Sequence, residues 1–218
     1  MMKPNAALKR FLEALATRLR AARSEACARF AAELDGLSAI RSTPLPTPRI
    51  PVPALPVLRH WPKAVAGASA IDPVLGQALS DLYPGFVWRQ NPNYVRRPPS
   101  PEFLEGYGYA VIAGPNGMIT SGIALGVLVL KPGLLYPAHV HPAEEIYLVL
   151  DPASAWWREG EDWRKGLDGA LVHHPPNVEH AMEAGAAPLC ALYLWRGDLI
   201  THAALAPQAE RRSARCTE

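Results

Sequence analysis

The part of the chain that follows Tyr83 consists of short apolar runs separated by glycine, proline and asparagine. Runs of this length predict β-strands, and no helix-length pattern lies between them, which excludes a doubly wound parallel sheet. The pattern therefore predicts an antiparallel sandwich or barrel. Glu159, Gly160 and Glu161 separate two of the runs and predict a tight hairpin. The predicted strands are Gly106–Ala113, Ile119–Leu130, Glu145–Leu150, Ala155–Arg158, Asp162–Arg164, Ala170–His173 and Pro188–Trp195.

The residues before this region predict helices. From Asn5 to Leu34, apolar side chains recur in steps of three and four, which predicts one long amphipathic helix with Gly36 as its C-cap. The apolar face of such a helix also offers a surface on which two copies of the chain can pair as a homodimer. Farther along, Asp72 before a proline predicts the N-cap of a second helix that ends near Leu82.

A proline-rich segment separates the two predicted helices. Seven prolines lie between residues 44 and 62, which excludes a helix or a central strand there and predicts an extended connector. The chain is thus expected to have three parts. Residues 1–84 form a helical extension with its connector, residues 85–206 form the barrel with the functional site, and residues 207–218 form a C-terminal tail.

Composition narrows the classes of function. The 218 residues include 22 Lys and Arg against 20 Asp and Glu, so a net charge of +2 provides no basic field for nucleic acid or an anionic membrane. The sequence has neither an apolar run that spans a bilayer nor a secretory signal core, so we expect a cytoplasmic protein. The three cysteines are far apart, which argues against a disulfide framework or a thiolate zinc site. These observations favour a small-molecule ligand.

A histidine-rich segment carries residues suited to chemistry. Residues 133–147 read GLLYPAHVHPAEEIY. On a strand, the two-residue period sends the side chains of His139 and His141 to one face. Glu145 and Tyr147 repeat that spacing after a short turn, so four donor groups are expected to converge.

A second segment, residues 169–180, supplies a further histidine. Pro175 and Asn177 favour a turn that brings His180 toward the first group. Imidazole and carboxylate ligands without thiolates suit Zn, Fe, Mn, Ni or Co, and they favour a site with open positions over a structural zinc site. We therefore predict that one divalent transition metal is held by His139, His141, Glu145 and His180.

Neighbouring polar residues are expected to face elsewhere. Glu144 precedes Glu145 on the same predicted strand, so its side chain is expected to point outward. His173 and His174 alternate in the same way, one toward the core and one toward the surface. Neither of these two histidines is assigned to the site.

The two histidine segments resemble the two motifs of the cupin superfamily. The first reads Gly133-x5-His139-x-His141-x3-Glu145, and the second reads Gly169-x5-Pro175-x4-His180. The resemblance implies a mainly β fold, an antiparallel cupin barrel of the double-stranded β-helix or jelly-roll type, here with an N-terminal α-helical extension. Three turn positions depart from the motifs, namely Pro152, Asn177 and Ala184. Because asparagine tolerates the left-handed conformation, the turn at Asn177 is expected to survive.

Further residues extend the resemblance, namely Tyr136, Tyr147 and Trp195. With the helical N-terminal region, they are similar to the cupin-type dimethylsulfoniopropionate (DMSP) lyases of the DddQ type. The resemblance implies a metal-dependent carbon–sulfur lyase that cleaves DMSP to dimethyl sulfide and acrylate by β-elimination. It also implies that Tyr147 is the general base and that Tyr136 orients the substrate or assists the proton transfer.

Aromatic residues are the expected contacts of the sulfonium group in such a substrate, since aromatic faces attract a cation by about 0.5 to 2 kcal/mol. Trp195 is the predicted substrate-binding wall, with Tyr193, Tyr94 and Trp88 as further candidates. Other aromatic residues on strand-like stretches are assigned to packing: Tyr107, Tyr109, Trp156, Trp157 and Trp163.

Two other functions fit the same residues. One is another cupin metalloenzyme, such as a non-haem Fe dioxygenase of a small thiol or acid, which oxygen consumption distinguishes. The other is a non-enzymatic cupin that binds a small ligand, because a fold and a metal motif do not determine function. The sequence also leaves open which metal is bound, whether Tyr147 ligates it, and whether residues 88–99 form a lid or a solvated loop.

Overall fold

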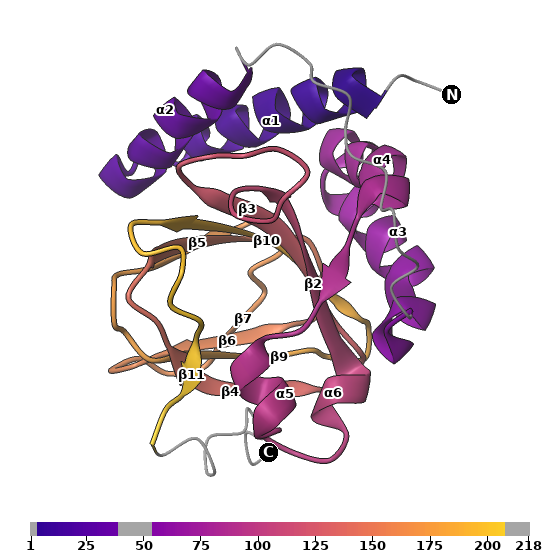
Figure 1. Cartoon of the computed structure of the whole chain (residues 1–218), viewed down its shortest axis with the longest axis vertical. Helices are drawn as coiled ribbons and strands as arrows, with labels where there is room; N and C mark the ends of the chain where they lie inside the picture. The colour runs from indigo at the N-terminus through magenta and orange to yellow at the C-terminus, as the bar shows by residue number, and fades with distance from the viewer. Residues whose placement is uncertain (1–3, 39–53, 208–218) are drawn as a thin grey trace.

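The computed structural model describes residues 4–38 and 54–207. Two antiparallel sheets face each other and form the barrel (Figure 1). In spatial order, the six-stranded sheet contains β1 (Trp88–Arg89), β2 (Tyr107–Ala113), β3 (Ala124–Leu130), β10 (Leu189–Arg196), β5 (Glu144–Val149) and β8 (Leu171–His174). The five-stranded sheet contains β11 (Ala204–Leu205), β4 (Leu135–Val140), β9 (His180–Glu183), β6 (Ala155–Arg158) and β7 (Arg164–Lys165).

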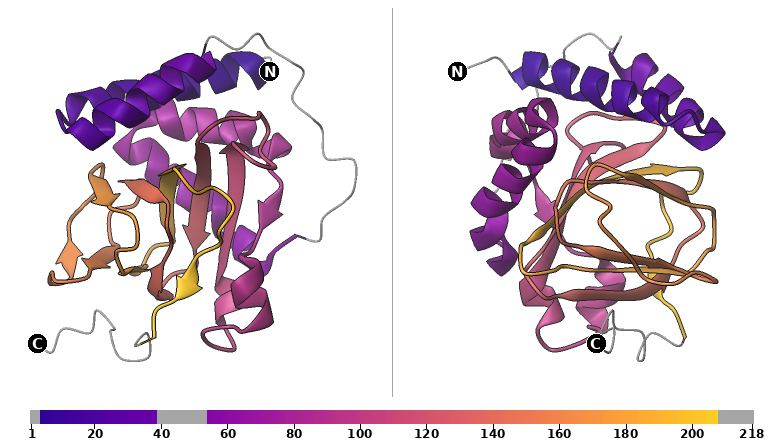
Figure 2. Two further views of the ribbon diagram at one scale, coloured as in Figure 1. Left: turned by 60° about the vertical axis from the view of Figure 1, so that its left-hand side comes forward. Right: turned by 180° about the vertical axis from the view of Figure 1, so that it is seen from behind.

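Helices cover the outer face of the six-stranded sheet, as Figure 2 shows from two further sides. The α-helices are α1 (Pro4–Ala21), α2 (Glu25–Ser38), α3 (Trp61–Ile71), α4 (Pro73–Leu82), α5 (Pro92–Arg96) and α6 (Phe103–Gly106), and the 3₁₀ helices are η1 (Pro56–His60) and η2 (Tyr83–Gly85). None of the helices that the structure describes is both long enough and apolar enough to cross a membrane. The predicted antiparallel barrel with an N-terminal helical extension is confirmed.

The central strands are buried on both faces, which explains their continuous apolar runs. In β3, Val127 and Val129 pack in the core shared with helices α1 to α4, whereas Leu128 and Leu130 pack in the barrel interior. Strand β5 alternates in the same way, so its inward residues line the interior of the barrel. The helical extension therefore contributes about half of the side chains in the core that it shares with the six-stranded sheet.

The predicted single helix from Asn5 to Leu34 is wrong, because two helices occupy this segment. Arg23 has a left-handed backbone (φ 53°), which turns the chain between α1 and α2. The Ser24 hydroxyl then accepts a hydrogen bond from the backbone N–H of Cys27 at 3.1 Å, in the manner of an N-cap. Gly36 lies inside α2 and is not a C-cap. The spacing of three and four between apolar residues continues through the break because each of the two helices buries an apolar face.

The apolar faces of α1 and α2 are buried within the single chain. The apolar surface that we expected to form a homodimer interface is therefore covered within one chain, and pairing of two copies stays a prediction. The buried residues include Phe11, Leu15, Leu19, Phe30 and Leu34, each with no exposed side-chain surface.

The proline-rich connector is described only from residue 54 onward, and there the exclusion of helix is wrong. Pro56 and Pro62 lie in the first turns of η1 and α3, where a missing backbone N–H costs no hydrogen bond. The remainder of the connector and residues 208–218 of the predicted tail lie outside the described residues. The predicted cap is confirmed, because the Asp72 carboxylate accepts hydrogen bonds from the N–H groups of Val74 (3.2 Å) and Leu75 (3.1 Å).

Most predicted strands are confirmed within one or two residues at their ends. A hairpin joins β6 and β7, and Gly160 takes a left-handed conformation (φ 80°), but the connection is wider than the predicted tight turn, because the pairing stops at Trp156 and Arg164. Two boundaries are wrong, because β3 begins at Ala124 and β7 covers only Arg164–Lys165. Strand β4 corresponds to the strand on which we placed His139 and His141, although His141 lies just past its end. Strands β1, β9 and β11 are additional, and the sequence does not mark these three because they have two or four residues.

The Asp72 cap generates a prediction about stability. We expect Asp72→Ala to lower the free energy of unfolding by about 1 kcal/mol, because two N–H groups of α4 lose their acceptor. Asp72→Asn keeps an acceptor but removes the ion pair with Arg18, whose Nε lies 3.7 Å from the carboxylate. Urea denaturation of the three proteins measures both effects. A loss in Asp72→Asn as large as that in Asp72→Ala would contradict the capping role.

Candidate functional site

Three histidines predicted as metal ligands meet inside the barrel. His139 lies on β4, His141 follows directly after that strand, and His180 begins β9 as the register partner of His139. All three are buried, and the ligating nitrogens lie within 4.8 Å of one another. Asn177 supports the approach of the second segment, because it takes the predicted left-handed conformation (φ 62°) and its N–H donates to the His141 carbonyl at 2.9 Å.

The same backbone contact orients each of the three imidazoles. In each ring, Nδ1 lies within hydrogen-bond distance of a carbonyl oxygen two residues away along the chain. The contacts are His139 to Pro137 (2.9 Å), His141 to Ala143 (3.1 Å) and His180 to Val178 (2.9 Å). The contact at Nδ1 turns Nε2 toward the cluster, and Nε2 offers its lone pair to a metal once it carries no proton, which is the usual second-sphere arrangement of metal-binding histidines.

Glu145 on β5 connects two of these rings. Its Oε2 atom lies 3.0 Å from Nε2 of His141 and 3.1 Å from Nε2 of His180, and its Oε1 accepts a hydrogen bond from the Trp195 indole at 2.5 Å. Burial would raise the pKa of Glu145, but the charges and hydrogen bonds of His141 and His180 outweigh burial and hold the pKa well below its ordinary value. The site therefore contains a buried carboxylate in its charged form.

These donors fit a divalent transition metal. Burial, followed by the charges of His180 and His141, lowers the pKa of His139 well below its ordinary value, so that imidazole is neutral as a ligand must be. Nε2 of His180 is buried and makes no hydrogen bond of normal geometry within the described residues. A cation between the rings would accept the Nε2 lone pairs and compensate the carboxylate charge. Three imidazoles with an adjacent carboxylate and no thiolate match the preferences of such an ion.

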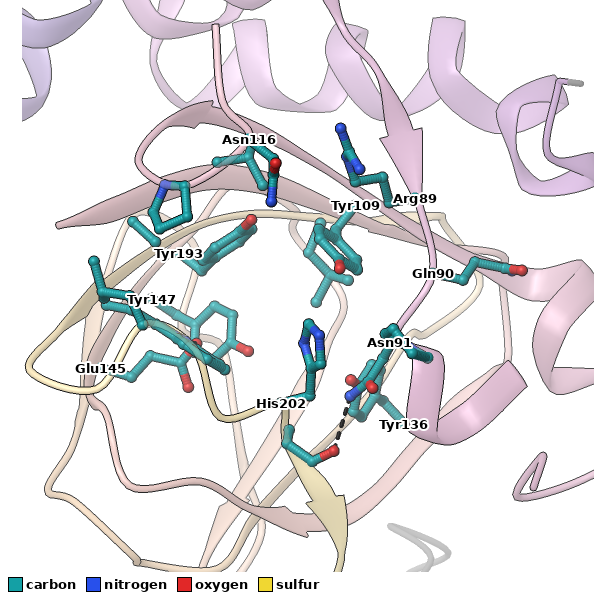
Figure 3. A pocket seen from close by; sticks show the side chains of 18 residues that line it. Arg89, Gln90, Asn91, Tyr109, Asn116, Tyr136, Glu145, Tyr147, Tyr193 and His202 are labelled. Carbon is teal, nitrogen blue, oxygen red and sulfur yellow. Dashed lines mark hydrogen bonds between the residues drawn. The ribbon is translucent and has the colours of Figure 1, made fainter. Parts of the chain in front are cut away.

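A cavity of about 360 Å³ opens beside this cluster (Figure 3). Glu145, Tyr136, Tyr147 and Trp195 line it, and all four were predicted as site residues. The Trp195 ring also stacks on His141, with ring centroids 4.2 Å apart and an interplanar angle of 28°. The substrate space and the histidine cluster thus share Glu145 and Trp195 as a common boundary.

The two tyrosines predicted for proton transfer are buried phenols. For Tyr147, burial and then the charge and hydrogen bond of Glu145 raise the pKa well above its ordinary value. For Tyr136, burial and the neighbouring phenols of Tyr94 and Tyr107 raise the pKa in the same direction. In the absence of an added positive charge, both hydroxyls therefore keep their protons at neutral pH.

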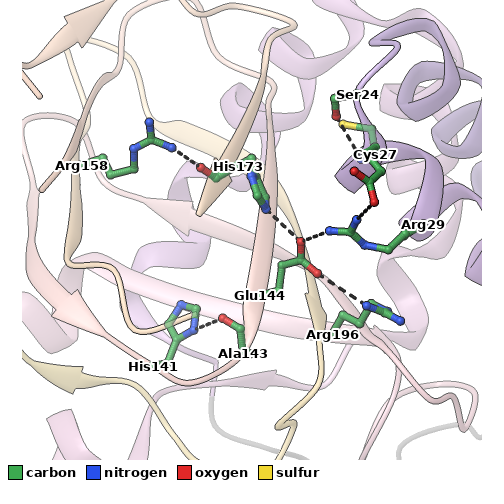
Figure 4. Close-up of polar contacts among 10 residues, drawn as sticks. Ser24, Cys27, Arg29, His141, Ala143, Glu144, Arg158, His173 and Arg196 are labelled. Atoms are coloured by element: carbon green, nitrogen blue, oxygen red, sulfur yellow. Dashed lines mark hydrogen bonds and ion pairs between the residues drawn. The ribbon is translucent and has the colours of Figure 1, made fainter. Parts of the chain in front are cut away.

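Glu144 points away from the cavity, as predicted from strand alternation. Its carboxylate lies 2.7 Å from the Arg29 guanidinium of α2, 3.0 Å from Nε2 of His173 and 3.7 Å from the Arg196 guanidinium (Figure 4). His173 is the surface member of its pair, and His174 is the buried member with 1% exposure. The alternation predicted for these two histidines is confirmed.

The aromatic assignments are partly wrong. Tyr193 lines the cavity, but Tyr94 packs against Phe103 and Tyr107 in the core, and Trp88 packs against Trp61. Tyr109, which the strand pattern assigned to packing, lies on the cavity wall and meets Tyr193 edge to face at 6.2 Å. Aromatic residues on a strand look the same in sequence whether they face a core or a cavity.

Five polar residues of the cavity lining are missing from the sequence-based site. Arg89, Gln90 and Asn91 lie in and just after β1, Asn116 and His202 come from separate loops, and no short motif links the three segments (Figure 3). Segment 88–99 contains β1 and α5, so it is not only a solvated loop, and its residues 89–92 line the cavity. The buried Asn91 side chain fixes this segment by donating to the Ala203 carbonyl at 2.9 Å.

Comparison with known proteins places the chain among DMSP lyases. Residues 9–191 match the family model of dimethylsulfoniopropionate lyase. The chain is 32% identical over 183 residues to dimethylsulfoniopropionate lyase DddQ of Ruegeria pomeroyi, which covers 83% of this chain and 85% of that protein. The crystal structure of DMSP lyase DddQ from Ruegeria pomeroyi superposes with a TM-score of 0.62 at 26% identity, covering 93% of this chain and 98% of the other.

A second solved structure, from the crystal structures of the DMSP lyases RdDddP and RnDddQII, superposes with a TM-score of 0.70 at 27% identity. It covers 93% of this chain and 99% of the other. The matches therefore extend across both the helical extension and the barrel. The chain belongs to the dimethylsulfoniopropionate lyase family.

Proposed function

We propose that this protein cleaves DMSP to dimethyl sulfide and acrylate. The observation that carries the proposal is the convergence of three buried histidines and Glu145 beside a cavity lined by Tyr136 and Tyr147, in a chain of the DMSP lyase family. The cavity, at about 360 Å³, has the size of a small-molecule site. Its aromatic lining suits a sulfonium, and its Glu145 side, next to the histidines, suits a carboxylate held near a cation.

The metal ligands in this proposal are the predicted set, namely His139, His141, Glu145 and His180. A divalent transition metal bound there, whether Zn, Fe, Mn, Co or Ni, supplies the positive charge that stabilises a carboxylate on which negative charge builds up. The chain itself supplies the orientation of the donors, since Trp195 holds one oxygen of Glu145 and backbone carbonyls hold the Nδ1 atoms of the histidines.

Tyr147 is the proposed general base. Its phenolate oxygen takes the proton from the carbon next to the substrate carboxylate, and the carbon–carbon double bond of acrylate forms. The carbon–sulfur bond breaks, and its electron pair leaves with sulfur as neutral dimethyl sulfide, so the departure requires no acid. Since burial and Glu145 keep the phenol protonated without a cation, base activity of Tyr147 depends on positive charge at the histidine cluster.

The sulfonium end of the substrate is proposed to lie against aromatic rings. Trp195 offers its face from β10, and Tyr193 and Tyr109 continue the same wall. Tyr136 reaches the cavity from β4 and packs its ring 4.5 Å from His139, which places its hydroxyl group for contact with the substrate.

Metal dependence is the first test. We expect purified protein to release dimethyl sulfide and equimolar acrylate from DMSP, to lose this activity after treatment with a chelator, and to regain it with one of the five metals. Headspace gas chromatography measures the sulfide, and metal analysis measures occupancy. Full activity in protein shown to be free of metal would contradict the proposed metal role. Absence of dimethyl sulfide with every metal would contradict the lyase assignment.

Substitution of the proposed base is the second test. We expect Tyr147→Phe to lower kcat by about 10² to 10⁴, because a positioned base contributes a factor of that size. Tyr83→Phe is the control, since it removes a tyrosine hydroxyl group outside the cavity, where Tyr83 stacks on Trp61, and its kcat should stay within a few-fold of the parent. The comparison requires that the parent and both variants contain the same amount of metal. Activity of Tyr147→Phe equal to that of Tyr83→Phe would exclude Tyr147 as the base.

A further inference from the structure

One more buried histidine, His174, lies against the histidine cluster without belonging to it. It is on β8 as the register partner of Glu145, so both side chains enter the barrel on the same face. His174 is 1% exposed, and its ring lies parallel to that of His180, with centroids 4.0 Å apart and an interplanar angle of 11°. Its ring also meets Tyr147 edge to face at 6.0 Å.

Both ring nitrogens of His174 lack a hydrogen-bond partner within the described residues. Burying a polar atom without a partner costs folding free energy, so an apolar ring would serve the fold better at this position. The part of His174 that the structure uses is therefore the flat face of the ring, which covers His180.

His180 has no other parallel neighbour among its ring contacts. His139, His141 and Tyr147 meet it at steep angles of 61°, 83° and 62°. The hydrogen bond from Nδ1 of His180 to the Val178 carbonyl holds one edge of the ring at 2.9 Å, and the His139 ring meets it at a steep angle with centroids 4.1 Å apart. The parallel ring of His174 at 4.0 Å adds the face contact that opposes rotation of the ring out of its plane, a torsion that is otherwise soft for histidine.

A second histidine of the cluster, His141, has the same combination of an edge contact and a face contact. His141 has its Nδ1 on the Ala143 carbonyl and its face against Trp195 at 28°. Two of the three clustered histidines thus combine an edge contact to the backbone with a face contact to an aromatic ring. Trp195 also lines the cavity, whereas His174 does not, so His174 acts only through the residue it covers.

We propose that His174 is a positioning residue that fixes the ring plane of His180 and so directs its Nε2 atom toward the bound metal. The inference rests on the proposed metal role of the cluster. His174 itself makes no metal bond and transfers no proton in this proposal. Its flat aromatic face is what holds the ring plane of His180.

Cobalt(II) binding tests this role without turnover. We expect His174→Leu, which removes the flat face, to weaken Co(II) affinity about 10- to 100-fold, the usual effect of losing a partner that orients a ligand. It should also change the visible absorption of the bound ion. His174→Phe restores a flat ring and should bind Co(II) within about threefold of the parent. His173→Leu is the matched control on the same strand, because its side chain faces outward to Glu144, and it should bind like the parent.

Thermal unfolding of the metal-free proteins separates positioning from folding. His174→Leu and His174→Phe should melt no lower than the parent, since each removes two unpaired buried nitrogens. Parent-like Co(II) affinity in His174→Leu would overturn the inference, as would equal weakening in His174→Phe, or a fall in metal-free Tm that matches the loss of affinity. Failure of the parent protein to bind any Co(II) would overturn the metal site itself, and the positioning role with it.

Discussion

The charged carboxylate of Glu145, fully buried in the barrel, sets the requirements for everything around it. A buried charge must be compensated, and no lysine or arginine in the described residues forms an ion pair with this one. Two imidazoles, an indole N–H and a phenol surround it instead. The same groups are those that a divalent ion and a proton-transfer reaction need. The feature that is costly for folding is therefore the one that makes the site reactive.

The helical extension and the barrel interior contact opposite faces of strand β5, which carries Glu145. Inward residues of β5 contact the cluster, and outward residues of the same strand pack under α1 and α2. Arg29 of α2 approaches Glu144, the direct neighbour of Glu145, so the outer layer holds the strand one residue from the carboxylate that faces the histidines. The extension thereby supports the strand that carries the chemistry, as well as completing the core.

Local spacing made the convergence of the histidines and Glu145 predictable, whereas contacts between distant segments leave no such pattern in the sequence. His139, His141 and Glu145 follow the period of a strand and a short turn, and Asn177 is one of the few residue types that adopt the required left-handed backbone. The break at Arg23 was missed because the apolar period runs through it. Arg89 and His202 carry no motif, since only the folded barrel brings their segments to one cavity. Tyr109 was misassigned because strand periodicity identifies a face but not whether that face is filled.

The opposite surroundings of Glu144 and Glu145 have a consequence for how this sequence can vary. If the turn before β5 gained one residue, the strand would slip in register, Glu144 would take the place of Glu145, Ile146 would take the place of Tyr147, and Arg29 of α2 would lose its acid. If the turn lost one residue, Ile146 would take the place of Glu145, and β5 would present no carboxylate to the histidines. The length of the turn at Pro142 and Ala143 therefore decides which side chains β5 presents to the barrel interior and which it presents to α2.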